Sequence, residues 1–177
     1  KEKAQEEGFK LIIVRFPTVY GKDPRKGSLF DFLKKLIDNK SFVTRFDWPG
    51  LTGLIHVNDA AKAIFLSSRL KINPGKSETV LFSSENLTLA QISKILHEAM
   101  GYKYSEIKIP KFFWSFAQIL RRYVYLLEPF LNPKQYNLVW RASLIDDHVY
   151  NCNSSKANKL FSNWKPKKLE GVVTEIL

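Results

Sequence analysis

Residues 11–21 read LIIVRFPTVYG, and this stretch decides the fold class that the sequence predicts. Four branched apolar residues at 11–14 are followed by Arg15, and Pro17 and Gly21 then close the run. A short, continuous apolar run that ends in turn residues is typical of a strand buried on both faces of a parallel sheet. Ligands of such sheets bind beyond the carboxyl ends of the strands, so residues 16–21 are predicted to lie at a binding site.

Three further motifs follow this stretch along the chain. They read IHVNDAA at 55–61, NLTL at 86–89, and SKA at 155–157 followed by WKP at 164–166. In this order, and with the RFPTVYG segment, they resemble the R-P-x-x-V-Y-G, I-H-V-D-D-V-A, x-L-T-x and S-K-A…G-W-x-P motifs of the extended short-chain dehydrogenase/reductase superfamily. That superfamily includes NAD(P)-dependent epimerases, dehydratases and 3β-hydroxysteroid dehydrogenase-like reductases. Each motif alone is weakly specific, but their order and spacing over nearly the whole chain support the resemblance.

The resemblance also implies which part of such an enzyme these residues form. Members of the superfamily begin with a glycine-rich G-x-x-G-x-x-G turn and carry a catalytic Tyr-x-x-x-Lys before the R-P-x-x-V-Y-G strand. Neither pattern occurs before the strand at residues 11–15 of this chain. Tyr20 is not the catalytic tyrosine, because the residue four positions later is Pro24 and not a lysine. Residues 1–8, KEKAQEEG, resemble the end of the helix that bears the catalytic pair. We therefore expect the C-terminal half of an enzyme, inactive without its N-terminal half.

The expected fold class is α/β, with the C-terminal part of a Rossmann-type doubly wound parallel sheet and a smaller α/β substrate-binding lobe. Residues 1–27 are assigned to the last part of the dinucleotide-binding domain. Residues 28–177 are assigned mainly to the substrate-binding lobe, with interleaved strands and helices that return to the sheet.

Capping signals and hydrophobic periodicity predict the individual elements. A helix is expected over residues 29–39, because Ser28 and Asp31 have the spacing of a capping box. A second capping box at Thr88 and Gln91 predicts a helix from residue 89 onward. The other expected elements are helices over 60–70 (capped by Asn58 or Asp59), 112–127, from 132, 153–161 and 169–177, and strands over 42–46, 79–82 and 106–109.

The cofactor site is predicted at Phe16, Pro17, Thr18 and Val19, which the resemblance places at the nicotinamide end of NAD or NADP. Proline fixes the direction of the chain where the strand must turn, and backbone groups there can meet the carboxamide. Alternatively, the segment is an ordinary strand-to-loop turn with Tyr20 packed inward. No residue of this chain is predicted to be catalytic.

Candidate substrate contacts are Tyr20, Lys22, Arg45 and Arg141. In sugar-nucleotide members an Arg precedes the I-H-V-D-D segment, where this chain has LTG at 51–53. A second Arg precedes Pro-Gly-Asp in those members, whereas Ala142 and Ser143 follow Arg141 here. These departures favour the reductase and hydroxysteroid dehydrogenase-like branch over a nucleotide-sugar substrate.

Composition limits the partners and the chemistry. The 28 Lys and Arg against 17 Asp and Glu give a net charge of +11, which favours an anionic ligand or, more simply, a solvated basic surface. The single cysteine, Cys152, excludes an internal disulfide and is interpreted as a packing residue in a reducing compartment. The three histidines are poorly spaced for a metal site, so none is predicted, and His56 is interpreted as a scaffold residue.

These observations lead to two hypotheses. The first is the C-terminal portion of a cytoplasmic NAD(P)-dependent oxidoreductase, epimerase or dehydratase. Its expected substrate is a hydroxyl- or keto-bearing small molecule, either a sugar nucleotide or a sterol- or flavonoid-like compound. Its expected partners are that substrate, the N-terminal half of the same protein and a second copy in a homodimer, with no nucleic acid. The second is a non-catalytic relative that serves as a binding or assembly subunit, with its basic surface in contact with lipid or partner proteins. The aromatic residues of this part of the chain are interpreted as core residues that also form part of a pocket wall, with peripheral contact to a membrane as the alternative; they are Phe112, Phe113, Trp114, Phe116, Tyr123, Tyr125 and Phe130.

Overall fold

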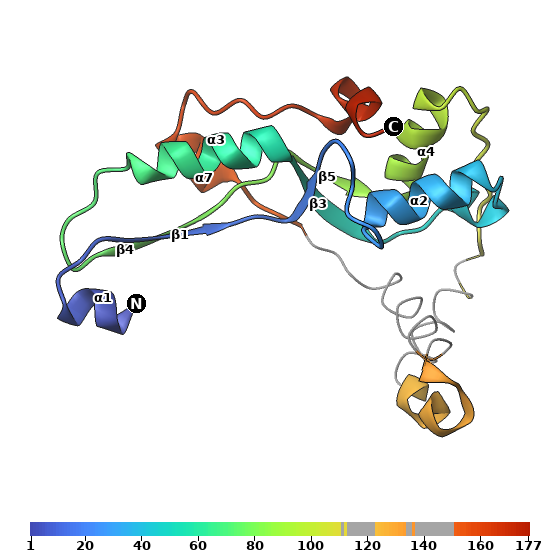
Figure 1. Ribbon diagram of the computed structural model, residues 1–177, viewed down its shortest axis with the longest axis horizontal. Coiled ribbons are helices and arrows are strands. Elements are labelled where there is room, and N and C mark those ends of the chain that lie inside the picture. The colour runs from blue at the N-terminus through green and yellow to red at the C-terminus, as the bar shows by residue number, and fades with distance from the viewer. Residues whose placement is uncertain (111, 113–122, 134–135, 137–150) are drawn as a thin grey trace.

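The structure is a computed structural model that describes residues 1–110, 112, 123–133, 136 and 151–177. In this part of the chain, helices pack around two small sheets (Figure 1). Strand β1 (Leu11–Arg15) pairs in parallel with β4 (Ser77–Leu81). Strand β3 (Leu51–His56) lies between β2 (Thr18–Tyr20), which is parallel to it, and β5 (Glu85–Thr88), which is antiparallel. The predicted α/β class with parallel strands is confirmed.

The stretch at residues 11–21 forms two strands in two different sheets, and Phe16 and Pro17 connect them. Proline has no N–H to donate to a ladder, so the run of strand hydrogen bonds is interrupted at this point. The strand was predicted to be buried on both faces, and this is wrong for the described part: residues 11–14 are only half-buried and Arg15 is exposed. Among the described strands, β1 has β4 as its one neighbour, which leaves much of its surface uncovered.

The larger core lies between β3 and the helices α2 (Leu29–Asp38) and α4 (Leu89–Ala99). The C-terminal turns η3 (Leu169–Gly171) and η4 (Val173–Glu175) close it from above (Figure 1). Its buried members are Tyr20, Phe30, Leu33, Ile37, Leu54, Ile92, Leu96, Leu169, Val172, Val173 and Ile176.

A second core lies between the β1–β4 pair and the helices α3 (Val57–Ser68) and α7 (Ser155–Leu160). Its centre is Phe82, which is 0% exposed. The Phe82 ring meets the Trp164 ring edge-on at 5.0 Å and the Phe161 ring at 5.5 Å. Trp164 thus ties the C-terminal segment to the end of β4.

The predicted capping box is complete at Thr88, whereas at Ser28 only the N-cap hydrogen bond is found, because the Asp31 carboxylate accepts from Gly27 N instead of Ser28 N. Ser28 Oγ accepts a hydrogen bond from Asp31 N at 3.4 Å. At α4, Thr88 Oγ1 accepts from Gln91 N at 3.1 Å, and Gln91 Oε1 accepts from Thr88 N at 2.8 Å. These two helix starts are confirmed because a cap depends only on residues within one turn.

Other predicted elements differ from the structure. Residues 42–45 form a 3₁₀ turn, η1 (Phe42–Arg45), instead of a strand, and only Ile107 of the expected strand 106–109 makes a bridge, to Phe46. Helix α3 begins at Val57, directly after β3, so its N-cap is His56 and neither Asn58 nor Asp59. β5 was not predicted as a strand, and helix 153–161 shortens to α7.

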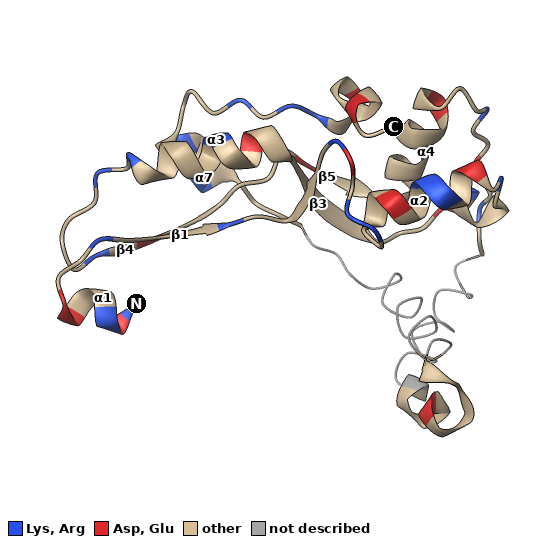
Figure 2. Cartoon of the chain, viewed as in Figure 1, with Lys and Arg blue, Asp and Glu red and all other residues tan. Residues whose placement is uncertain are grey.

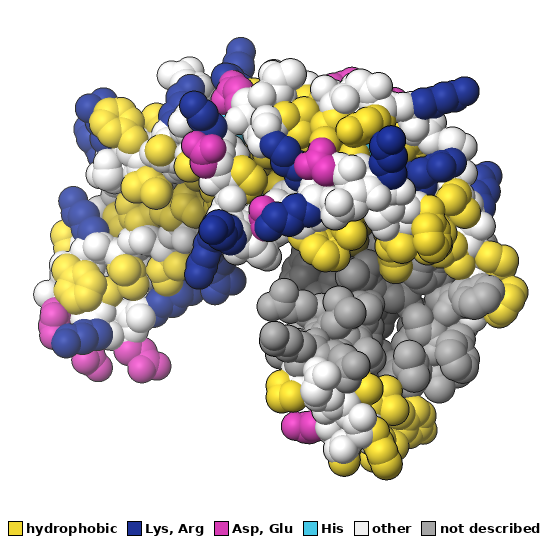
Figure 3. All heavy atoms as spheres, turned by 45° about the vertical axis from the view of Figure 1, so that its right-hand side comes forward, with side chains coloured by type: hydrophobic (Ala, Val, Ile, Leu, Met, Phe, Trp, Pro, Cys, Tyr) yellow, Lys and Arg dark blue, Asp and Glu magenta, His cyan; other side chains and the backbone are white. Residues whose placement is uncertain are grey.

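Much of the predicted helix 112–127 lies outside the described residues, as does most of the segment that follows residue 132. The described part there contains the 3₁₀ segment η2 (Val124–Phe130). Figure 3 shows apolar side chains gathered on this segment, and Phe130 is 83% exposed. At the start of the chain, residues 2–6 form a short helix, α1 (Glu2–Glu6). Basic side chains are spread over most of the elements (Figure 2). Within the described ranges, no helix combines the length and the apolar character needed to cross a membrane.

Candidate functional site

The carboxyl ends of β1 and β4 bring two loops to one edge of their sheet. Arg15 lies opposite Leu81 in the parallel register, and the carbonyl of Arg15 accepts a hydrogen bond from Phe82 N at 3.0 Å. The Phe16 and Phe82 rings lie 6.2 Å apart just beyond this last pair. Residues 16–18 therefore lie beside residues 82–84, at the edge where parallel sheets bind their ligands.

Close packing around Gly53 fixes the position of Pro17. A Cβ atom placed on Gly53 would lie 3.0 Å from Pro17 Cβ and 2.5 Å from Cys152 Sγ. Only glycine allows the backbone of β3 to approach both residues this closely. The next residue, Thr18, also contacts β3: its Oγ1 lies 3.3 Å from Thr52 Oγ1. Strand β3 therefore holds the connection between the two sheets, residues 16–17, through Gly53 and Thr52.

The structure separates the predicted substrate contacts instead of bringing them together. Tyr20 and Lys22 lie at the opposite end of β2 from Pro17, and Lys22 is exposed. Arg45 Nε donates to the carbonyl of Ser105 at 2.8 Å, so this guanidinium ties η1 to the segment after α4. Arg141 lies outside the described residues. Val19 is 47% exposed, whereas Phe16, Pro17 and Thr18 are half-buried.

Tyr20 is a core residue in this structure. Its side chain is 3% exposed, and its ring packs 5.2 Å from Phe30 and 5.4 Å from His56. Burial raises the pKa of Tyr20, and the carboxylates of Glu85 and Asp59 raise it further. The phenol therefore stays neutral at physiological pH and cannot serve as a general base, in agreement with the interpretation that Tyr20 is not the catalytic tyrosine.

His56 and Asp59 are also scaffold groups. The His56 ring is 1% exposed and its Nε2 lies 3.3 Å from Glu175 Oε2. Asp59 Oδ2 accepts a hydrogen bond from Lys167 N at 2.8 Å, and the Asp59 carbonyl accepts from Trp164 Nε1 at 3.4 Å. The start of α3 is thus bound to the C-terminal segment. In the described ranges, no three His, Cys, Asp or Glu side chains gather as a metal site.

Cys152 lies against the same connection but has the features of a packing residue. Burial raises the pKa of its thiol, and the nearby Gly53 backbone lowers it by a smaller amount. Because the nucleophile is the thiolate, a thiol with a raised pKa is poorly suited to attack a substrate. The backbone of Cys152 is held by Asn86, whose Oδ1 accepts from Cys152 N at 2.9 Å.

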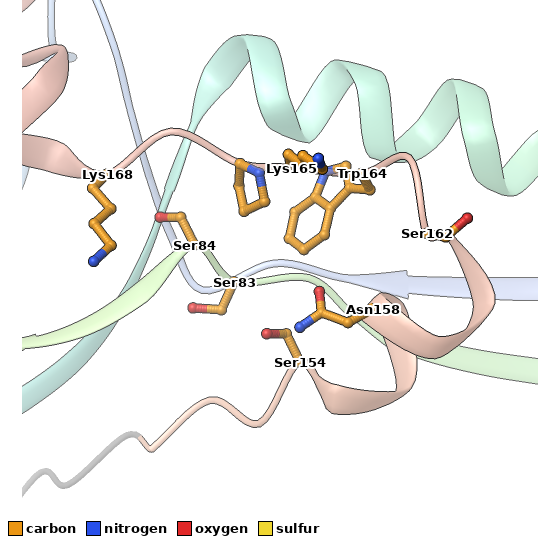
Figure 4. Close-up of a pocket in the computed structure, with 9 residues that line it drawn as sticks. Ser83, Ser84, Ser154, Asn158, Ser162, Trp164, Lys165 and Lys168 are labelled. Atoms are coloured by element: carbon orange, nitrogen blue, oxygen red, sulfur yellow. The ribbon is translucent and has the colours of Figure 1, made fainter.

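A pocket of about 440 Å³ opens next to this edge. Figure 4 shows it between the loop after β4, helix α7 and the segment that leads from Trp164 to Lys168. The lining is mostly polar and comprises Ser83, Ser84, Ser154, Asn158, Ser162, Trp164, Lys165, Pro166 and Lys168. Sequence reasoning assigned none of these residues to a site and recognised residues 164–166 only as a motif. Ser83 and Ser84 directly follow a predicted buried strand and could have been found by the same rule that selected residues 16–21.

No protein-family model and no curated protein matches this sequence. The fold does match solved structures. The protein gox2253 has a TM-score of 0.64 and 21% identity, over 93% of this chain and 47% of that one. UDP-glucuronic acid 4-epimerase from Bacillus cereus, in complex with UDP-glucuronic acid and NAD, has a TM-score of 0.61 and 16% identity over 94% of this chain and 44% of that one.

UDP-glucose 4-epimerase from Thermotoga maritima, with UDP-glucose, gives a TM-score of 0.57 and 18% identity. That match covers 97% of this chain and 46% of the epimerase. The chain thus spans less than half of the length of the structures it matches. The expected resemblance to the C-terminal half of the epimerase and dehydratase superfamily is confirmed at the level of the fold.

Proposed function

We propose that this chain forms the C-terminal half of an NAD(P)-dependent oxidoreductase, epimerase or dehydratase that acts on a hydroxyl- or keto-bearing small molecule. The single observation that carries the proposal is the parallel β1–β4 pair, which brings residues 16–18 and 82–84 to the carboxyl edge of one sheet. Dinucleotides bind at such an edge in open α/β sheets. The matched structures that were solved with NAD share this fold over nearly all of the present chain.

In this proposal the chain supplies a wall of the cofactor site. Residues 16–19 meet the nicotinamide end, and Gly53 holds Pro17 in place from behind. When bound, the cofactor supplies hydride transfer. The proton-transferring pair is proposed to reside in the N-terminal half. Tyr20 is buried and its pKa is raised, and the Asp59 carboxylate is bound to the backbone of Lys167. The 177-residue chain alone is therefore expected to be inactive.

Hydrogen exchange on the full-length protein, with and without NAD or NADP, tests the proposal. Cofactor binding is expected to slow exchange in a peptide that covers residues 16–19 and to leave η1 unchanged, because Arg45 there is bound to Ser105. Pro17→Ala should weaken the cofactor affinity about tenfold, since it frees the backbone direction at the contact. Pro74→Ala, in an exposed turn, is the matched control.

Two outcomes would contradict the proposal. Binding of either nucleotide without protection at residues 16–19 would move the cofactor site elsewhere. Absence of binding by both nucleotides would favour the assembly subunit, which the exposed aromatic residues of η2 also support: Tyr125 is 59% and Phe130 83% exposed.

A further inference from the structure

The pocket beside α7 is lined by two lysines, which lie apart along the segment after Trp164 (Figure 4). Lys165 and Lys168 line it, and in the part of the chain that the structure describes neither ammonium group makes an ion pair. Two other lysines nearby are paired: Lys167 lies 3.9 Å from Glu175, and Lys156 contacts Glu78. No carboxylate is among the described residues that line the pocket. The two unpaired charges are therefore available to an anion.

The segment that carries these lysines is held in place by buried contacts. Trp164 is 3% exposed and packs on Phe82. Farther along, Asp59 Oδ2 accepts from Lys167 N at 2.8 Å, and Glu85 Oε1 accepts from Leu169 N. The carboxylates of Asp59 and Glu85 thus bind the backbone N–H groups of the residues on either side of Lys168. A backbone fixed in this way reduces the ordering cost of binding.

The opposite side of the pocket offers oxygen acceptors. The Ser84 hydroxyl donates to the Leu54 carbonyl at 2.7 Å, and the Ser83 hydroxyl, on a residue only 3% exposed, has the Glu85 carbonyl at 3.2 Å and the Leu54 carbonyl at 3.3 Å as acceptors for its proton. Each hydroxyl has one proton, so both serine oxygens keep lone pairs for a ligand that donates. Asn158 and Ser154 reach toward Ser83 from α7 and the residue before it (Figure 4).

We propose that this pocket binds a small oxyanion that also carries free hydroxyl groups, such as a phosphomonoester or carboxylate of a polyol. Lys165 and Lys168, which lie apart along one segment, attract the anionic group, and Ser83, Ser84 and Asn158 form hydrogen bonds with the hydroxyl groups. Ammonium–oxyanion hydrogen bonds are the strong, charge-assisted kind, whereas the serine contacts select among anions. The proposal uses none of the residues assigned to the cofactor and stands independently of it.

Calorimetric titration of the full-length protein with glycerol 3-phosphate, inorganic phosphate and glycerol tests this inference. Glycerol 3-phosphate is expected to bind more tightly than phosphate, and glycerol alone not to bind. The double variant K165Q/K168Q should bind glycerol 3-phosphate at least about tenfold more weakly, because both cations that line the pocket are lost. The matched control K71Q/K103Q makes the same change of charge at two exposed lysines elsewhere and should bind like the wild type.

Failure of the wild type to bind glycerol 3-phosphate at millimolar concentration would overturn the proposal. Equal weakening in K71Q/K103Q would also overturn it, because it would indicate general attraction to a basic protein. If K165Q/K168Q proves less stable on heating, Asn158→Leu decides the matter: this exposed α7 residue can be changed without loss of charge, and unchanged affinity in it would count against the pocket. Hydrogen exchange at residues 16–19 with NAD reports on the cofactor site separately, so the two proposals fail independently.

Discussion

Strand β1 is more apolar than strand β3 and yet is less buried. Leu54 and Ile55 of β3 are 0% exposed, whereas residues 11–14 of β1 are only half-buried. β3 is the middle strand of its sheet, with β2 and β5 on either side, while β1 has β4 alone among the described strands. The number of neighbouring strands, and not the hydrophobicity of the strand's own residues, therefore decides how deeply a strand is buried.

The sharpest test of this comparison uses the same substitution in both strands. Ile55→Ala removes a side chain that is 0% exposed and should lower the free energy of unfolding by about 2–5 kcal/mol. Val14 packs against the second core, and neighbouring side chains in a strand alternate, so Ile13 points to the other face of the sheet. If the proposed N-terminal half covers that face, Ile13→Ala should cost a similar amount in the full-length protein.

Urea denaturation of the two variants and the wild type measures both effects. A loss of about 1 kcal/mol or less for Ile13→Ala would mean that its side chain remains partly in water in the full-length protein, because truncation of an exposed residue leaves little cavity. That result would contradict a doubly wound sheet built around β1. It would also mean that β1 is less buried than β3 in the full-length protein.

The connection between the two strands can be disturbed at Gly53. In Gly53→Ala the new Cβ would lie within 3.0 Å of both Cys152 and Pro17, so the backbone must shift, at an expected cost of about 1–3 kcal/mol. The shift should also weaken cofactor binding, because Pro17 moves with it. Gly171→Ala is the control, since nothing lies within 4 Å of its added Cβ. Equal thermal midpoints for the two variants would show that β3 does not hold Pro17.

The same comparison explains which parts of the structure could be predicted from the sequence. The starts of α2 and α4 were predicted correctly because Ser28 and Thr88 find their partners within one turn. The division of residues 11–21 between two sheets was not predicted, because the residues that separate β1 from β2 act through β3, and Gly53 is far away in the sequence. Residues 42–46 have the composition of a strand, but Thr44 Oγ1 donates to the Ser41 carbonyl and stabilises a turn instead.

The candidate site was predictable to a similar degree. The rule that ligands bind beyond the carboxyl ends of parallel strands located residues 16–18 correctly at such an end. The rule could not place Lys22 and Arg45, because their positions depend on long-range contacts such as the one between Arg45 and Ser105. Lys165 and Lys168 were not assigned to a site for the same reason, since they reach the end of β4 only through the packing of Trp164 on Phe82.

The smallest expected change in stability comes from the ion pair between Asp31 and Lys35 on the surface of α2. Asp31 pairs with Lys35 at 2.9 Å and accepts from Gly27 N at 2.7 Å, and these contacts lower the pKa of Asp31 below its ordinary 3.8. A lowered pKa in the folded state stabilises the protein above the ordinary pKa, and this contribution is lost as the pH falls through the folded value. Asp31→Asn should therefore lower the thermal midpoint slightly at pH 7 and have no effect at the most acidic pH at which the protein folds.

Asn keeps an oxygen that can accept from Gly27 N, so the variant removes mainly the charge. Asp38→Asn, at the other end of the same helix, is the control. It should not lower stability at pH 7, because a negative charge near a helix C-terminus is unfavourable and its removal relieves that interaction. A difference between Asp31→Asn and the wild type that persisted unchanged into strong acid would show that Asp31 acts through the geometry of the cap and not through its charge. Such a result would mean that water screens the ion pair completely.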